Sequence, residues 1–204
     1  GARIGQGLSR GRRGLSVPAL LAFAVLITVT LPIWLPVAVL AYAARMRFRL
    51  PIARLLAFGV CWAWIEVAGV AHSFATWLAG KGTDPATQYG LMGWWAAALM
   101  SALQRTIGIA PRLEGAEALA GGNVVVLSRH ASLADSLLSA WAIRVQAGLW
   151  PRYVLKRELL FDPCLDIVGL RVPNHFLDRE APDHDAELGA LRDLAGGVGA
   201  GCAA

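Results

Sequence analysis

The chain has 204 residues, of which 56% are hydrophobic and only 16% are charged, and its formal net charge is +5. Water-soluble globular domains carry about 25% charged residues. The low charged fraction and the mean hydropathy of +0.52 together exclude a domain that is fully surrounded by water. Basic clusters beside apolar runs favour an anionic lipid surface over nucleic acid, for which the sequence contains no motif. The three cysteines show neither a C-x-x-C pair nor metal-ligand spacing.

The N-terminal third predicts a membrane anchor. Residues 1–16 are rich in Gly, Arg and Ser and predict a disordered basic segment with arginines available for lipid headgroups. Residues 17–79 predict membrane-anchoring helices, because 17–44 carry no charge and 55–78 are interrupted only by Glu66 and His72. The first run is much longer than the apolar region of a secretory signal, so we expect it to be retained.

Two clusters of arginines bear on how residues 17–79 are arranged in the membrane. As a straight helix, residues 17–44 would be about 42 Å long, against a hydrocarbon core of about 30 Å. Pro32 and Pro36 predict a break within this run. Two plain spans would place one arginine cluster against the positive-inside bias. A hairpin that enters and returns would keep both clusters on the cytoplasmic face, and we prefer it, with Glu66 facing a helix partner. The clusters are Arg3, Arg10, Arg12 and Arg13, and Arg45, Arg47, Arg49 and Arg54.

Residues 80–204 predict a domain of the α/β class, because strand-like and helix-like segments alternate. A linker at 80–88 precedes a helix at 89–109, whose Trp94 and Trp95 suit either a membrane interface or a packed core. The β-branched run 123–128 predicts a buried strand. The further segments are a helix at 132–146, strands within 152–156 and 171–179, and a helix at 183–195.

The strongest chemical signal is a histidine followed by an aspartate in S-R-H-A-S-L-A-D. His130 and Asp135 come just after the predicted strand, where α/β proteins bind ligands. A carboxylate beside an imidazole orients it as a general base, which an attacking alcohol needs. Two other interpretations stay open. Asp135 could form a capping arrangement with Ser132, and His130 could be a hydrogen-bonded histidine at a strand end.

Three cations interrupt the apolar sequence that follows. Lys156, Arg171 and Arg179 would be costly there without a partner. A phosphate-bearing substrate would supply one, and arginine offers bidentate geometry for it. A solvated strand edge, or an ion pair with Glu158 or Asp178, is the alternative for each.

These segments resemble the glycerolipid acyltransferases, especially the 1-acylglycerol-3-phosphate acyltransferases, over roughly residues 90–195. The resemblance implies that His130 deprotonates a glycerol hydroxyl, with Asp135 orienting it, and that Arg179 and Lys156 hold the acceptor's phosphate. It also places Glu158 and Asp178 in the substrate-binding blocks. Three blocks match in the family's order: H-x4-D at His130 and Asp135; K-x-E-L…P…G at Lys156, Glu158, Leu159, Pro163 and Gly169; and F-[IVL]-D-R at Phe176, Leu177, Asp178 and Arg179.

The resemblance also sets the expected partners. Acyl-CoA or acyl carrier protein would be the co-substrate, a lysophospholipid resembling lysophosphatidic acid the acceptor, and no metal or other cofactor would be required. The enzyme would serve phospholipid biosynthesis at the inner membrane, with its catalytic domain on the cytoplasmic face.

Two departures from the family pattern bear on activity. Arg129 stands where many members have Asn, which leaves the acceptor headgroup open. The family's E-G-T-R block is absent, so we expect an incomplete domain. The alternative is accordingly a catalytically inactive, membrane-bound fragment. A metal-dependent hydrolase using His130, His175 and His184 is disfavoured because these histidines lack known ligand spacing.

Overall fold

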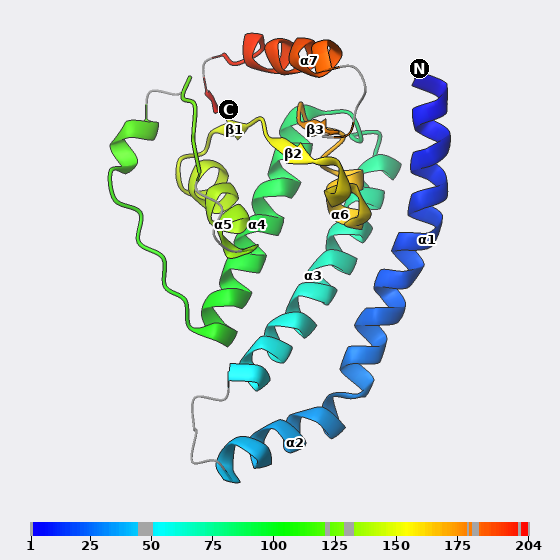
Figure 1. Cartoon of the computed structure of the whole chain (residues 1–204), viewed down its shortest axis with the longest axis vertical. Helices are drawn as coiled ribbons and strands as arrows, with labels where there is room; N and C mark the ends of the chain where they lie inside the picture. Colours follow the sequence, from blue (N-terminus) through cyan, green and yellow to red (C-terminus); the bar gives the residue numbers. More distant parts are fainter. Residues whose placement is uncertain are drawn as a thin grey trace.

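The computed structural model describes residues 2–44, 51–120, 123–128, 133–178, 180, 184–199 and 201–203, and most of them are helical (Figure 1). The α-helices are α1 (Ala2–Val29), α2 (Leu31–Ala44), α3 (Pro51–Leu78), α4 (Pro85–Ile107), α5 (Leu133–Ala140), α6 (Pro163–Ile167) and α7 (His184–Gly196). The other helical segments are the 3-10 helices η1 (Ala116–Leu119) and η3 (Arg157–Phe161) and the π-helix η2 (Trp141–Gln146). The strands are β1 (Trp150–Pro151), β2 (Val154–Lys156), β3 (His175–Leu177) and β4 (Cys202–Ala203).

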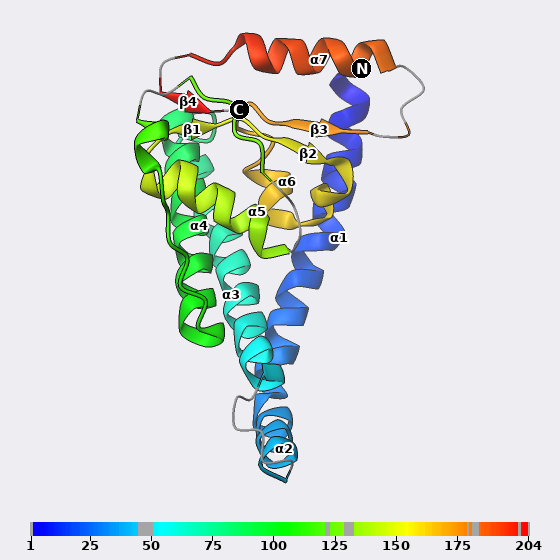
Figure 2. The same ribbon diagram turned by 60° about the vertical axis from the view of Figure 1, so that its left-hand side comes forward.

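The expectation of an α/β domain is wrong. Helices make up 71% of the structure and strands only 6%. The strands form two separate parallel pairs, β1 with β4 and β2 with β3. α7 lies above these strands in both views, at the opposite end of the molecule from α2 (Figure 2). The molecule is therefore a mainly helical protein that carries two small patches of parallel strand.

The segment 123–128 accounts for much of the difference. It is extended, but its one strand-type contact within the described residues is a parallel bridge between Val124 and Ala203. Val125 and Leu127 are 74% and 93% exposed. A buried central strand needs backbone partners along both edges, and one bridge does not supply them. The β-branched run alone was therefore insufficient to make a strand.

Other local predictions are confirmed. The expected strands contain β2 and β3, the helix expected at 132–146 contains α5 and η2, and the helix expected at 183–195 matches α7 to within one residue at each end. The expected linker at 80–88 is shorter in the structure, because α4 begins at Pro85: the Asp84 side chain accepts a hydrogen bond from the Thr87 N–H at 2.9 Å, and Pro85 occupies the first turn of α4. At the other end, Gly108 adopts a left-handed φ of 83° and its N–H bonds the carbonyl oxygens of Leu103 and Gln104.

The first apolar run divides into two helices near its prolines. α1 ends at Val29 and α2 begins at Leu31. Pro32 lacks the N–H that would continue the ladder, but it is tolerated in the first turn of α2. Pro36 stays inside that helix. α1 itself begins at Ala2, within the stretch for which we expected no regular structure.

Two helices are long and apolar enough to cross a membrane, namely residues Gly11–Val29 of α1 and all of α3. They lie side by side and run in opposite directions (Figures 1 and 2), and the Trp64 Nε1–H donates to Thr28 Oγ1 at 2.8 Å. Many of their large apolar side chains are exposed, as a lipid-facing surface requires. These include Leu21, Phe23, Leu26, Val29, Leu55, Phe74 and Trp77.

One described arginine from each cluster can be located relative to α3. Arg13 lies near the end of α3, where it lines a pocket with Ser73. Arg54, the described member of the second cluster, lies near the start of α3, beside Gly108 at the end of α4. A cation there is favoured by the negative end of the α4 dipole. The structure therefore separates Arg13 from Arg54 by most of the length of α3.

The core is built around α4. Its buried face contacts α3 on one side and α5 with η2 on the other. Trp95 is partly buried and packs against this core. Tyr153 contacts the main cluster and a second, smaller one formed by Tyr89, Met92 and Val172. The buried residues of the main cluster are Ala96, Leu99, Met100, Leu103, Leu137 and Ala140.

Glu66 faces a helix partner, as expected. Its side chain on α3 is fully buried, and its Oε1 accepts a hydrogen bond from the Trp95 Nε1–H of α4 at 2.7 Å. Gly69, one turn further on, lets α6 approach, because a Cβ there would lie 2.5 Å from Cys164 Sγ. α3 thus places a buried carboxyl group and a glycine against α4 and α6.

The Glu66–Trp95 contact predicts a measurable contribution to stability. Trp95→Phe is expected to lower the free energy of unfolding by about 1–3 kcal/mol, because it leaves a buried acceptor unpaired. Glu66→Leu combined with Trp95→Phe should cost less than the sum of the two single variants. The measurement is chemical unfolding in a neutral detergent. Strict additivity would show that the two side chains do not interact.

Tyr153 predicts a loss of stability at alkaline pH. Burial raises the pKa of Tyr153 to about 12, compared with about 10 in an unfolded chain. The protonated phenol is therefore favoured by folding, so this stability is complete below about pH 10 and is lost as pH rises towards 12. Tyr153→Phe should reduce the decline of the unfolding midpoint over this range. Parallel declines in both proteins would contradict the assignment.

Candidate functional site

One open pocket of about 390 Å³ adjoins the H-x4-D segment. It lies between the η1 region, the extended residues 126–128, α5 and η2. Most of its wall is apolar, and among the described residues Asp135 is the one charged residue that lines it. We call it the Asp135 pocket; it is lined by Leu113, Leu119, Val126, Leu127, Ser128, Asp135, Leu138, Ser139, Ala142 and Ile143.

Asp135 reaches this pocket from the first turn of α5. A carboxylate in that position is favoured by the positive end of the helix dipole. His130 and Ser132 lie outside the described residues, so the structure decides neither the expected His130–Asp135 pairing nor the capping alternative. Ser128 lines the pocket and is followed at once by Arg129 and His130 in the chain.

The second and third sequence blocks meet in space. β2 and β3 pair in parallel with Val154 opposite His175, Leu155 opposite Phe176 and Lys156 opposite Leu177. The K-x-E-L block therefore begins beside the F-L-D-R block, although 21 positions separate Arg157 from Asp178. This contact is a tertiary feature that neither block alone could have predicted.

The individual side chains of these blocks differ in their surroundings. Lys156 and Glu158 are exposed, and Asp178 is half-buried. Asp178 pairs with Arg157, and its Oδ1 accepts a hydrogen bond from the Glu180 N–H at 3.1 Å. Arg179 lies outside the described residues. Lys156 is not among the residues that line the Asp135 pocket.

Two further block residues have structural roles. Pro163 occupies the first turn of α6, and Asp162 caps that helix by accepting from the Leu165 N–H at 3.0 Å. Burial raises the pKa of Asp162, while the N–H donors of Leu165 and Cys164 lower it. A Cβ at Gly169 would lie 2.4 Å from the Leu165 carbonyl oxygen, so only glycine fits there.

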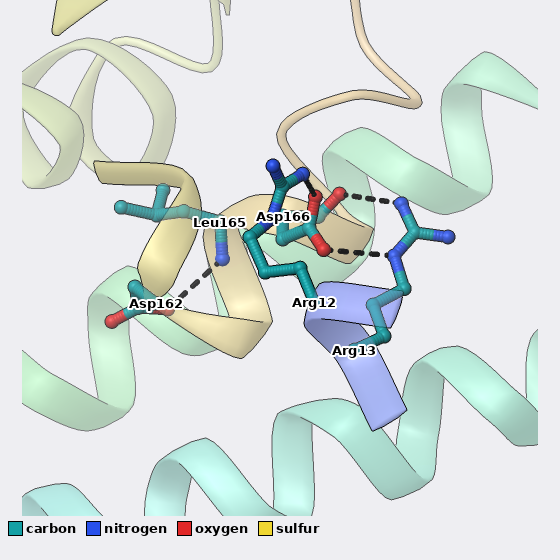
Figure 3. A network of polar contacts seen from close by, with 5 residues as sticks. All are labelled: Arg12, Arg13, Asp162, Leu165 and Asp166. Carbon is teal, nitrogen blue, oxygen red and sulfur yellow. Dashed lines mark hydrogen bonds and ion pairs between the residues drawn. The ribbon is translucent and has the colours of Figure 1, made fainter. Parts of the chain in front are cut away.

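Sequence reasoning missed two sets of contacts. Arg157, one residue after Lys156, is the cation that pairs with Asp178. Asp166 is fully buried and is bound by Arg12 at 2.5 Å and Arg13 at 2.9 Å, from opposite sides of its carboxylate (Figure 3). These arginines had been expected to remain available for lipid headgroups. No local pattern signals the contact, because more than 150 positions separate its partners.

His175 is the histidine of the disfavoured metal site whose side chain the structure describes. His175 Nε2 lies 2.7 Å from Glu187 Oε2, which ties β3 to α7. Within the described part of the chain, no group of three His, Cys, Asp or Glu side chains is placed to hold a metal ion. His130 and the side chain of His184 lie outside that part.

Comparisons of the chain with protein-family models, with curated proteins and with solved structures found no match.

Proposed function

We propose that the chain is an O-acyltransferase that moves a fatty acyl group from acyl-CoA or acyl carrier protein to the free hydroxyl of a lysophospholipid. The observation that carries the proposal is the position of Asp135 in an apolar pocket that is also lined by Ser128, two residues before His130 in the chain. An acyl chain needs apolar walls, and the reaction needs a base at one end of them. The Asp135 pocket offers walls of this kind beside Asp135.

The pairing of β2 with β3 gives the proposal independent support. It brings the cations of the second block to the start of the third block, where the resemblance expects the acceptor's phosphate. Lys156 is exposed there and accessible to such an anion. Arg157 adds a second positive charge, although Asp178 shares it. In this proposal Lys156 and Arg179 bind the phosphate, and Glu158 and Asp178 position them.

The chemistry requires one proton to move twice. His130 takes the proton from the acceptor hydroxyl, and the oxygen attacks the carbonyl carbon of the thioester. The C–O bond forms, the C–S bond breaks, and the thiolate of the donor receives the proton from the imidazolium. Asp135 orients His130 and stabilises its charged form. The products are an ester and a free thiol, with no covalent acyl-enzyme.

The apolar helices support a location at the membrane. Both substrates carry acyl chains, and α1 and α3 each present an exposed apolar surface long enough to cross a bilayer. We place the enzyme at the inner membrane with the Asp135 pocket on the cytoplasmic side, where acyl-CoA and acyl carrier protein are found.

The test is acyl transfer to lysophosphatidic acid by the purified protein in detergent. Labelled oleoyl-CoA and palmitoyl-carrier protein serve as parallel donors, with several other lysophospholipids as acceptors. Formation of a diacyl product with at least one donor is the expected result. Protein that is folded by circular dichroism and silent with every donor and acceptor would overturn the proposal and favour the inactive membrane-bound alternative.

The pocket also predicts a chain-length effect. Ala142→Phe adds a ring to the wall of the Asp135 pocket and should exclude the far end of a long acyl chain. We expect kcat/KM for a palmitoyl donor to fall by about tenfold or more, as a loss of a few buried methylenes implies. An octanoyl donor should be little affected. Equal losses for both donors would show that the acyl chain lies elsewhere.

A further inference from the structure

A second pocket, of about 310 Å³, lies between α1, α3 and α6 and shares no residue with the Asp135 pocket. We call it the arginine pocket, because two guanidinium groups stand in an otherwise largely apolar wall. It is lined by Arg13, Val70, Ser73, Phe74, Trp77, Ile167 and Arg171. Charge and apolar surface are thus combined in one cavity.

Positive charge exceeds negative charge around the arginine pocket. Asp166 supplies a negative charge there, but its carboxylate already forms ion pairs with both Arg12 and Arg13. Arg171 donates from Nη1 to Ser73 Oγ at 2.7 Å, and no described carboxylate lies within 4 Å of it. Burial, and then the charge of Arg13, lower the pKa of Arg171. An anion between the two arginines would relieve this repulsion.

The apolar side of the pocket faces outward from the last turns of α3. Phe74 and Trp77 are each 58% exposed, and their rings stack with centroids 5.6 Å apart. α3 has 28 residues and is about 42 Å long, so it exceeds a hydrocarbon core of about 30 Å by two turns. The arginines at the start of the apolar part of α1 mark this end as the one at headgroup level.

We propose that the arginine pocket binds one anionic membrane phospholipid, with its phosphate between Arg13 and Arg171 and an acyl chain along Phe74 and Trp77. Arginine matches phosphate geometry, and the exposed aromatic pair matches the adjoining chain. The bound lipid would join α1, α3 and the α6 region at the membrane surface. This site lies outside the proposed catalytic pocket and needs no acyl transfer.

The experiment is native mass spectrometry of the purified chain in a neutral detergent. Phosphatidylglycerol and phosphatidylcholine with identical acyl chains are offered in equal amounts. We expect one retained phosphatidylglycerol in preference to phosphatidylcholine. Arg171→Gln should lower that retention by about fivefold, the value of one arginine beside an anionic headgroup. Arg192→Gln, at an exposed position of α7, is the matched control and should retain the lipid as the original chain does.

Arg171→Gln also loses its hydrogen bond to Ser73 and could misfold for that reason. A second variant therefore tests the proposal without changing Arg171. Phe74→Glu changes an exposed side chain and should repel the phosphate without disturbing the core. Equal retention of the two lipids, or full phosphatidylglycerol retention by both variants, would overturn the proposal. Displacement of the lipid by excess inorganic phosphate would also overturn it, because it would indicate a site for free anions.

Discussion

His130→Ala is expected to lower kcat for acyl transfer by about 10²–10⁴-fold, the usual contribution of a positioned general base. Asp135→Asn should lower it by about 10²-fold or more, because the amide no longer stabilises the imidazolium. The measurement is steady-state transfer to lysophosphatidic acid from the better of the two donors. KM for both substrates should change little, because neither residue is assigned to substrate binding.

Two controls separate catalysis from folding. His72→Ala removes an exposed histidine of α3, and Asp193→Asn removes an exposed carboxylate of α7; both should keep normal activity. The pH profile adds a second readout, since His130→Ala should abolish the acidic limb that arises from imidazole protonation. An unchanged limb, or a loss of activity equal in the control variants, would contradict the assignment of His130 as the base.

Asp166→Ala is expected to cause the largest loss of stability among substitutions of a single charge. The carboxylate is fully buried, and Arg13 also donates from Nη2 to the Asp166 backbone oxygen at 2.9 Å. Removing one member of a buried ion group leaves the other charges uncompensated, which costs about 3–5 kcal/mol. Chemical unfolding followed by tryptophan fluorescence measures this loss, and proteolysis within the first turns of α1 should accelerate with it.

Asp178→Ala is the matched control, because it breaks the same kind of pair near the surface. Its partner Arg157 has a side chain that is 58% exposed, so the cost should stay below about 1 kcal/mol. Replacing Arg12, Arg13 and Asp166 together with Met, Met and Leu should recover most of the loss, because no charge stays unpaired. Equal destabilisation by Asp166→Ala and Asp178→Ala would show that α1 does not depend on this contact.

Helices and strands could be predicted from the sequence where a short stretch of residues is enough to indicate them. The apolar runs predicted long helices, but the helix expected at 89–109 covers Pro85–Ile107 in the structure, because Asp84 caps its start and Gly108 ends it. β2 and β3 were also found, because short apolar segments bounded by polar residues are a local pattern. Glu66 was correctly expected to face a helix, since a lone carboxylate on an apolar helix must find a donor.

The fold class could not be predicted in the same way. The run 123–128 has the composition of a central strand, but a strand exists only where neighbours pair with it, and Val124 has one bridge. Counting alternating segments therefore overestimated the sheet. The prolines at 32 and 36 predicted a break, while the place of the bend, next to Pro32 and not at Pro36, followed from the ladder of backbone hydrogen bonds.

For the candidate site, too, some features could be predicted from the sequence and others only from the structure. The sequence by itself determined which residues could carry chemistry, His130 and Asp135 above all, because their spacing and residue types belong to one short segment. Only the tertiary structure decided that Asp135 lies in an apolar pocket. It alone also decided that Arg157 forms an ion pair with Asp178, and that Arg12 and Arg13 form ion pairs with Asp166. The physical reason is distance along the chain: a buried charge is stabilised by whichever opposite charge the fold brings to it, and no local pattern names that partner.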